Sequence, residues 1–127
     1  MIGSKRDIVI EYKNRTVVGL TENVLVKGPG GAKKLVLARI DTGATKSSID
    51  MKLAAELRLG PILKAKVINS ASGSSLRAVI ETNIVICNKE IKGEFTLADR
   101  SIMKYRALIG QDILLNNGFL IDPTKSH

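Results

Sequence analysis

The sequence has 127 residues and a mass of 13.7 kDa, which fits a single domain spanning residues 1–127. No apolar run approaches the roughly 20 residues of a membrane-spanning helix, and the first residues lack the apolar stretch of a secretion signal, so we expect a cytoplasmic protein without membrane contact. A single cysteine, Cys87, and a single histidine, His127, exclude an internal disulfide and leave no zinc-ligand set and no Ser-His-Asp or Cys-His arrangement. We therefore expect no metal and no other cofactor, and carboxylates remain as the catalytic candidates.

The charge balance is strongly basic. Twenty Lys and Arg residues against 12 Asp and Glu give a net charge of +8 and a pI near 9.8, which attracts nucleic acid, acidic proteins or anionic peptides. Aromatic residues make up only 3% of the chain and tryptophan is absent, which is too little for the stacking surfaces of single-strand binders. Nucleic-acid binding is therefore kept only as an alternative function.

Most of the chain has the pattern of β-strands. Short runs rich in β-branched residues predict strands at 8–12, 16–18, 23–27, 33–40, 65–68, 76–87, 90–98, 107–109 and 118–121. The glycines at 28–31 predict a turn, and the small polar segment 69–75 predicts the flexible tip of a hairpin. Helical patterns occur in two places. One is the segment that Asp50 can cap and that Gly60-Pro61 can end, and the other is 110–116. The fold class expected is all-β with one or two short helices, with N-terminal strands in 1–32 and a catalytic core in 33–123.

Asp41 is the candidate catalytic carboxylate. It follows an apolar strand and precedes Thr42-Gly43-Ala44, so the sheet fixes the side chain where the chain turns. Gly43 permits a tight turn and a close approach of backbone N–H groups, and the Thr42 hydroxyl can bond to a neighbouring segment. An isolated Asp-Thr-Gly also occurs at ordinary strand-end turns, so the tripeptide alone does not establish a catalytic site.

From about residue 33 onward the chain resembles the retropepsin-like aspartic proteases. Leu35 to Ala44 is similar to the catalytic strand and loop of that family. Ala107 to Leu114 is similar to the apolar segment of the family that contains Gly-Arg-Asn/Asp, and the two segments have the order and separation expected of the family. The hairpin tip falls where the family places the flap that closes over the substrate. Segments 98–110 and 118–123 are similar to a prokaryotic branch often labelled ATP-dependent zinc proteases, although the sequence has neither zinc ligands nor an ATP-site motif. The resemblance implies a closed β-barrel of the acid-protease type and a homodimer.

The chemistry that this resemblance implies needs two chains. The family uses two carboxylates that share one proton around a water molecule, and one Asp-Thr-Gly per chain supplies half of them. The resemblance assigns catalysis to Asp41, Thr42 and Gly43, and it assigns substrate contacts to Ala44, Thr45, Ala71, Ser72, Gly73, Ser74 and Ile109. The expected function is hydrolysis of a peptide or protein substrate. A non-catalytic, dimeric peptide-binding module of the same fold is the alternative.

Two positions depart from the viral pattern. Thr45 and Gln111 stand where viral members carry an Asp and an Arg that pair, so at most a neutral hydrogen bond is expected there. Asp112 is expected to favour the positive end of a short helix.

Basic residues near the C-terminal strand suggest the kind of substrate. Arg100, Lys104 and Arg106 are candidates for holding acidic side chains of a substrate, in keeping with the basic charge balance. The same residues also fit a solvated loop. Cys87 is predicted to pack in the core.

Overall fold

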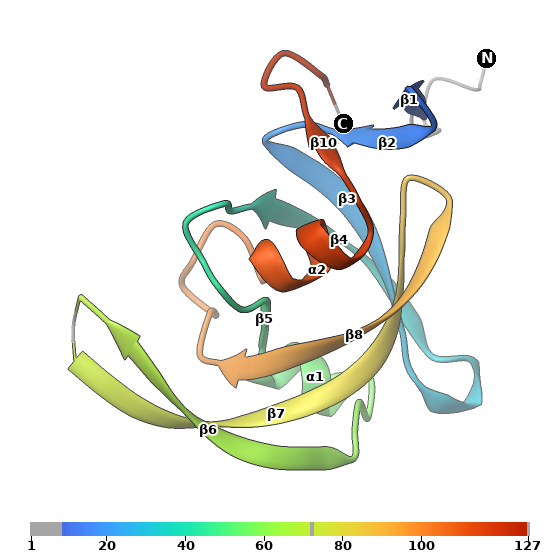
Figure 1. The fold of residues 1–127 in the computed structure, drawn as a ribbon. Helices are drawn as coiled ribbons and strands as arrows, with labels where there is room; N and C mark the ends of the chain where they lie inside the picture. The colour runs from blue at the N-terminus through green and yellow to red at the C-terminus, as the bar shows by residue number, and fades with distance from the viewer. Residues whose placement is uncertain (1–8, 72, 127) are drawn as a thin grey trace.

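A computed structural model describes residues 9–71 and 73–126 of the chain (Figure 1). The described residues form ten strands, two α-helices and a short 3₁₀ turn: β1 (Ile10–Tyr12), β2 (Arg15–Val18), β3 (Thr21–Lys27), η2 (Pro29–Gly31), β4 (Lys33–Ile40), β5 (Ser48–Asp50), α1 (Met51–Glu56), β6 (Ile62–Ser70), β7 (Gly73–Ile86), β8 (Lys89–Ala98), β9 (Ala107–Ile109), α2 (Gln111–Asn116) and β10 (Leu120–Ile121). None of the helices in these residues has the length and apolar character needed to span a membrane.

The larger of two sheets closes into a barrel. Its strand order is β3-β4-β9-β5-β8-β7-β6, and β3 also pairs with β7 along Val24–Lys27. This extra pairing joins the ends of the ring and leaves β6 outside it. In Figure 1 the β6–β7 hairpin extends away from the barrel. The prediction of an all-β fold closed into a barrel, with one or two short helices, is confirmed, and the number of α-helices in the described residues is two.

The barrel interior is filled by side chains that alternate along the strands. In β3 the buried positions, Val24 and Val26 among them, alternate with half-buried ones. Fully buried β-branched and aromatic residues from the other strands complete the core, including Ile49, Ile80, Ile84, Ile86, Phe95 and Ile109. Burial of each such side chain contributes about 1.5–3 kcal/mol to the free energy of folding. Because β3 is part of this ring, Thr21–Lys27 belong to the same barrel as the later strands.

Two parallel strands bring the ends of distant segments together. β4 and β9 are parallel with Ile40 opposite Ile109, so the loops that begin at Asp41 and Gly110 leave the same edge of the sheet. β5, which the sequence did not predict, returns the Asp41 loop to the sheet by pairing with both β8 and β9. Its three residues carry too little β-propensity to be recognised, and pairing on both sides makes them a strand.

Element boundaries differ from the prediction at turns. β6 runs through Ser70 and β7 begins at Gly73, so strand pairing continues through most of the segment predicted as a flexible tip. Helix α1 is capped by Asp50 as predicted, but it ends at Glu56, before Gly60-Pro61. The turn between β7 and β8 is Cys87-Asn88, with φ of 50° and 62°, one residue earlier than expected.

Candidate active site

Asp41 begins the loop that follows β4. Its N–H donates to the carbonyl of Ile109 (2.8 Å), and its own carbonyl accepts from the N–H of Ala44 (3.3 Å). The Oδ1 atom accepts from the N–H of Gly43 at 2.9 Å. Within the described part of the chain no other group donates to this half-buried carboxylate. The carboxylate is therefore fixed by the loop but open on one side.

Gly43 and Gln111 shape the same loop. A Cβ at position 43 would lie 3.3 Å from Oδ1 of Asp41, so a larger residue would crowd the carboxylate. The Gln111 side chain donates from Nε2 to the carbonyl of Thr42 at 2.7 Å. A neutral hydrogen bond thus stands where the viral ion pair would be, but its acceptor is the backbone of Thr42 and not the side chain of Thr45.

Ser47 ties the loop to α2 and to β8. Its buried hydroxyl donates to Oδ1 of Asp112 (2.7 Å) and accepts from the N–H of Gly110 (2.9 Å), while its carbonyl accepts from the N–H of Thr96 (3.0 Å). A Cβ on Gly110 would lie 2.8 Å from the carbonyl oxygens of Ala44 and Lys46, so only glycine fits. Nothing in the sequence singled out Ser47, because its role depends on partners about 50 and 65 residues away.

Asp112 does more than the predicted helix-end role. It lies in the first turn of α2, and its Oδ1 accepts from the N–H of Ile113 at 2.8 Å. Both of its oxygens also accept from Ser47, one from the hydroxyl and one from the N–H. Asp112 therefore joins the start of α2 to the Asp41 loop.

A groove of about 340 Å³ lies between the Asp41 loop and the β6–β7 hairpin. Three cations line it, Lys46, Arg77 and Arg100, and no Asp or Glu is among its lining residues. The complete lining is Gly43, Ala44, Thr45, Lys46, Ser48, Ile68, Asn69, Arg77, Thr96, Arg100 and Leu108. Such a groove favours anionic groups.

The predicted substrate residues of the Asp41 loop and those of the hairpin tip differ in whether they line this groove. Ala44 and Thr45 line the groove. Ala71, Gly73 and Ser74 are exposed at the hairpin tip and do not line it, and Ser72 lies outside the described residues.

The prediction for Ile109 is corrected by its burial. Ile109 is fully buried in the core, while the preceding Leu108 is half-buried and lines the groove. Successive residues of a strand point to opposite faces, so only one of the two can reach the groove. Leu108, and not Ile109, therefore lines the groove.

Asp50 fixes the segment that carries Arg100 and Arg106. This carboxylate has no solvent exposure and accepts from the N–H of Leu53 (3.2 Å), the N–H of Arg100 (2.8 Å) and Nη2 of Arg106 (2.9 Å). Burial by itself raises the pKa of the Asp50 carboxyl, but these hydrogen bonds and the Arg106 charge outweigh it and hold the pKa below the ordinary 3.8. Arg106 is therefore a structural partner of Asp50, and its role in substrate binding stays a prediction.

Of the three predicted cations only Arg100 reaches the groove. Its Nε donates to the carbonyl of Tyr105 (2.8 Å), and the guanidinium lies within electrostatic range of Asp41. Burial, followed by the charge of Arg77, lowers the pKa of Arg100. Lys104 instead places Nζ 5.5 Å from the centre of the Tyr105 ring.

The sequence analysis missed the other two cations of the groove. Arg77 lies opposite Lys66 in the hairpin, a pairing that the position of the tip could have indicated. The Lys46 ammonium, followed by partial burial, lowers the pKa of Lys66. Positive charges are thus crowded on this face of the hairpin, where an anion would relieve their repulsion.

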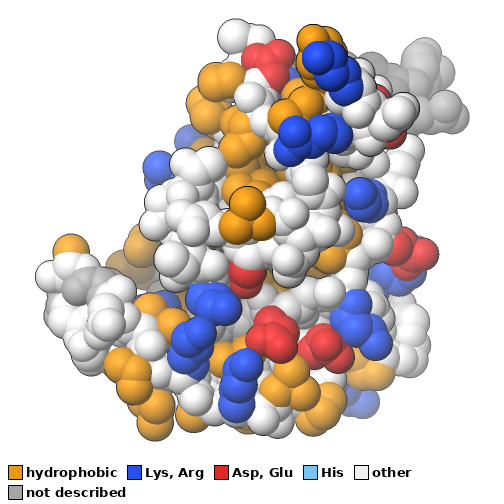
Figure 2. Space-filling view, in the orientation of Figure 1, with side chains coloured by type: hydrophobic (Ala, Val, Ile, Leu, Met, Phe, Trp, Pro, Cys, Tyr) orange, Lys and Arg blue, Asp and Glu red, His pale blue; other side chains and the backbone are white. Residues whose placement is uncertain are grey.

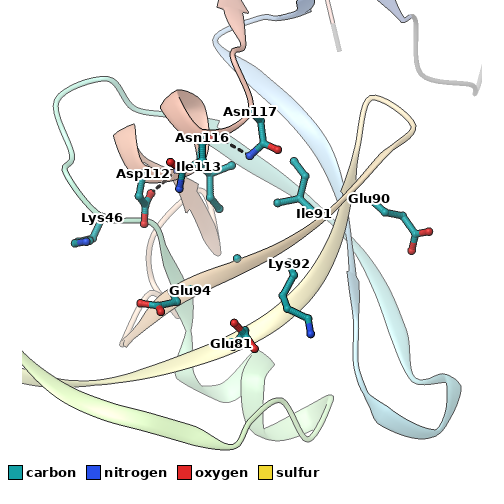
Figure 3. Close-up of a pocket in the computed structure, with 11 residues that line it drawn as sticks. Lys46, Glu81, Glu90, Ile91, Lys92, Glu94, Asp112, Ile113, Asn116 and Asn117 are labelled. Carbon is teal, nitrogen blue, oxygen red and sulfur yellow. Dashed lines mark hydrogen bonds between the residues drawn. The ribbon is translucent and has the colours of Figure 1, made fainter.

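A larger hollow, about 500 Å³, lies between β8 and α2 (Figure 3). Figure 3 shows its carboxylates spread around the walls and not converging on one point. Glu90 pairs with Lys27 (2.8 Å), Glu94 pairs with Lys64 (3.5 Å), and Asp112 is held by Ser47. In residues 9–71 and 73–126 no group of three or more His, Cys, Asp and Glu side chains could hold a metal. The carboxylate at Asp41 therefore remains the candidate for catalysis.

Solved structures share this fold. One is Lpg0085, a protein of unknown function (DUF785) from Legionella pneumophila subsp. pneumophila str. Philadelphia 1, with a TM-score of 0.61, 18% identity, and coverage of 87% of this chain and 95% of that chain. Another is EIAV protease in complex with the inhibitor HBY-793, with a TM-score of 0.63, 21% identity, and coverage of 87% of this chain and 96% of that chain. The chain therefore has the retropepsin fold.

The family is shown by the sequence itself. Residues 50–127 match the RimB-like family, described as retropepsin-like aspartic endopeptidase RimB. The chain belongs to this family of aspartic endopeptidases. The match begins at residue 50, so the Asp41-Thr42-Gly43 loop lies outside it. No curated protein matches the sequence.

Proposed function

We propose that this chain is a homodimeric aspartic endopeptidase in which the Asp41 carboxylates of two subunits hold and activate one water molecule. The observation that carries the proposal is the placement of Asp41, held by the N–H of Gly43 at 2.9 Å, open on one side, and next to a groove. Retropepsin-fold geometry and membership of an aspartic endopeptidase family support it. One carboxylate per chain requires a two-fold axis beside the loop.

The mechanism follows from two carboxylates sharing one proton. Like charges held close together cannot both ionise, so one Asp41 stays protonated while the other is charged. The charged one takes a proton from the water as its oxygen attacks the peptide carbonyl. The protonated one hydrogen-bonds to the carbonyl oxygen and then helps the amine to leave. Neither a covalent intermediate nor a cofactor is needed.

We further propose that the substrate is an acidic peptide. Lys46, Arg77 and Arg100 line the groove beside Asp41 without any opposing carboxylate in its lining. A guanidinium binds a carboxylate with two parallel hydrogen bonds, which fixes the orientation of a Glu or Asp side chain. The exposed strands of the β6–β7 hairpin can add backbone hydrogen bonds to an extended peptide.

Cleavage of a glutamate-rich peptide by the wild type and by Asp41→Asn tests the catalytic proposal. We expect cleavage by the wild type, inhibition by pepstatin, and loss of turnover in Asp41→Asn with peptide binding retained. Binding without cleavage by the wild type would instead support the non-catalytic peptide-binding module.

Arg77→Gln tests the substrate class. Loss of one charge-assisted hydrogen bond costs about 1.5 kcal/mol, or roughly tenfold in KM. We expect this rise for a glutamate-rich peptide and little change for the same peptide with glutamine, and Arg77→Lys should restore part of the affinity. Equal effects on both peptides would contradict charge recognition.

A further inference from the structure

Strand β6 forms the outer edge of the larger sheet. It pairs with β7 along Ile62–Ser70, and no other strand of the described residues pairs with it. In an antiparallel pair every second residue directs its N–H and carbonyl away from the neighbouring strand, so β6 presents a row of free backbone donors and acceptors. Figure 1 shows the β6–β7 hairpin standing away from the barrel. The edge is therefore accessible to an added strand.

The two faces of this hairpin carry different side chains. On one face Lys66 lies opposite Arg77. Successive residues of a strand point to opposite faces, so Val67 and Leu76, which are also opposite each other, lie on the other face. They are 58% and 71% exposed, and neither lines the groove described above. Figure 2 shows hydrophobic and Lys or Arg side chains next to each other at this end of the molecule.

The positive charge of the edge is not balanced. Residues 57–80 contain no Asp or Glu. Nζ of Lys64 lies 3.5 Å from Oε1 of Glu94, on β8, whereas Lys66 has no ion pair among the described residues. The charge of Lys46 is the largest cause that lowers the pKa of the Lys66 ammonium. A carboxylate placed next to Lys66 would both pair with it and reduce this repulsion.

The same lysines disfavour a second copy of the chain at this edge. Two β6 strands related by a two-fold axis at Ala65 would place Lys64 of each copy opposite Lys66 of the other. Like charges directly opposite each other are destabilising in a sheet, and lysines on an edge strand oppose edge-to-edge association. A strand with carboxylates at these positions meets the opposite condition. The charges therefore favour a different, acidic chain.

We propose that the free edge of β6 binds an extended segment of a partner protein in which acidic residues alternate with apolar residues, and that this segment adds one strand to the sheet. Its acidic side chains lie on the face of Lys64 and Lys66, and its apolar side chains lie on the face of Val67 and Leu76. The segment lies outside the groove and is not cleaved there, so the proposal does not depend on Asp41. It also requires an apolar residue at every second position, which a glutamate-rich substrate lacks.

Two peptides of the same composition test the alternation. One is a short acetylated peptide of alternating Glu and Val, and the other has all Glu residues before all Val residues. Fluorescence anisotropy of the labelled peptides measures their affinity for the wild-type protein. We expect the alternating peptide to bind at least about tenfold more tightly, because only this order places every carboxylate on one face. Equal affinities would overturn the proposal.

Val67→Glu tests the surface, with Leu35→Glu as the matched control. Leu35 is 60% exposed and lies on β4, so both substitutions place a carboxylate on an exposed strand position. We expect Val67→Glu to weaken binding of the alternating peptide by about tenfold or more and Leu35→Glu to leave it unchanged. Far-UV circular dichroism reports the folding of both variants. Equal affinities in the two folded variants would contradict docking on β6.

Lys66→Glu tests the charged face in the same way. Lys33→Glu is the control, because Lys33 is exposed on β4 and the change in net charge is identical. We expect a loss of about tenfold or more in affinity for Lys66→Glu alone. Equal losses in both variants would show general electrostatic attraction instead of a site. If Lys66→Glu or Val67→Glu changed the oligomeric state in sedimentation velocity without changing the peptide affinity, the edge would belong to a second copy and the proposal would be wrong.

N-methylated peptides test strand addition itself. Only every second N–H of an added strand faces the edge that it joins. We therefore compare the alternating peptide methylated on the backbone nitrogen of its Glu residues with the same peptide methylated on its Val residues. One of the two should lose about tenfold or more in affinity relative to the other. Equal affinities of the two methylated peptides would refute backbone pairing with β6.

Discussion

Replacing Asp50 by asparagine should destabilise the protein by removing the buried charge that holds Arg100 and Arg106. Asp50 accepts three hydrogen bonds with no solvent exposure, including one from Nη2 of Arg106 at 2.9 Å. An amide of the same shape has one oxygen and one NH₂ group, so at least one donor loses its acceptor. A charge-assisted bond contributes about 1.5–3 kcal/mol. Water can reach Arg106, which is 34% exposed, and recovers part of its loss.

The expected magnitude is about 3 kcal/mol lower free energy of unfolding at pH 7, since one charged bond and one buried N–H donor are affected. For a domain of this size that is on the order of 10 °C in the melting temperature. Urea unfolding followed by circular dichroism measures it. Glu90→Gln is the control, because the exposed Glu90–Lys27 pair should leave the urea midpoint almost unchanged.

The pH dependence of the stability distinguishes loss of the Asp50 charge from a change in the shape of the side chain. The pKa of Asp50 is lower in the folded protein than the ordinary 3.8, so its stabilisation is complete above that value and is lost as the pH falls through the folded-state pKa. Asparagine does not titrate. The difference between the wild type and Asp50→Asn should therefore be widest near neutral pH and narrow below about pH 3.8. A difference that is constant down to about pH 2.5, or no difference at pH 7, would refute the reasoning.

Other substitutions and treatments probe the loop, the thiol and the buried pair. Gly110→Ala places a Cβ 2.8 Å from the carbonyl oxygens of Ala44 and Lys46, so we expect the free energy of unfolding in urea to fall by about 1–3 kcal/mol and peptide cleavage to be lost. An active, equally stable variant would contradict the steric argument. Burial, followed by the charge of Glu22, raises the pKa of the Cys87 thiol to about 11, so Ellman's reagent at pH 8 should react with this thiol only after unfolding. Rapid reaction of the native protein would contradict the burial of Cys87. Lys125→Met leaves the Glu22 carboxylate buried without its cation and should lower the free energy of unfolding in urea by about 3–5 kcal/mol. The double variant Glu22→Gln, Lys125→Met should recover most of this loss of stability, and no recovery would show that the two side chains are not coupled.

The features that the sequence predicted well are those encoded locally. Alternating apolar residues identified most strands, and the Asp-Thr-Gly segment after an apolar strand identified the loop that carries Asp41. Asp50 was recognised as a helix cap because capping depends on residues three positions apart. The basic charge balance is consistent with the three cations, Lys46, Arg77 and Arg100, that line the groove, while the anionic partner itself stays a prediction.

The features that the sequence did not predict depend on distant partners. From the sequence alone Arg106 is expected to be a surface cation, yet it pairs with Asp50, which lies 56 residues earlier in the chain. Cys87 occupies a turn at φ 50°, which is uncommon for this residue type, and its thiol contacts Glu22, 65 residues away. Ile109 and Leu108 are both apolar, and only the pairing of β9 with β4 and β5 decides which of them faces the groove.

The hydrogen bonds around Ser47 explain how the Asp41 loop keeps its shape without the ion pair of viral proteases. Gln111 binds the carbonyl of Thr42, and Ser47 contacts Asp112, Gly110 and Thr96, so helix α2 with its N-cap and strand β8 both restrain the loop from inside one subunit. These contacts are neutral or involve a single carboxylate, and none of them requires the second chain. In the proposed dimer, association of two subunits would bring together loops that already have their shape in each subunit. Peptide cleavage on dilution should therefore follow the proposed monomer–dimer equilibrium and not a slow refolding step.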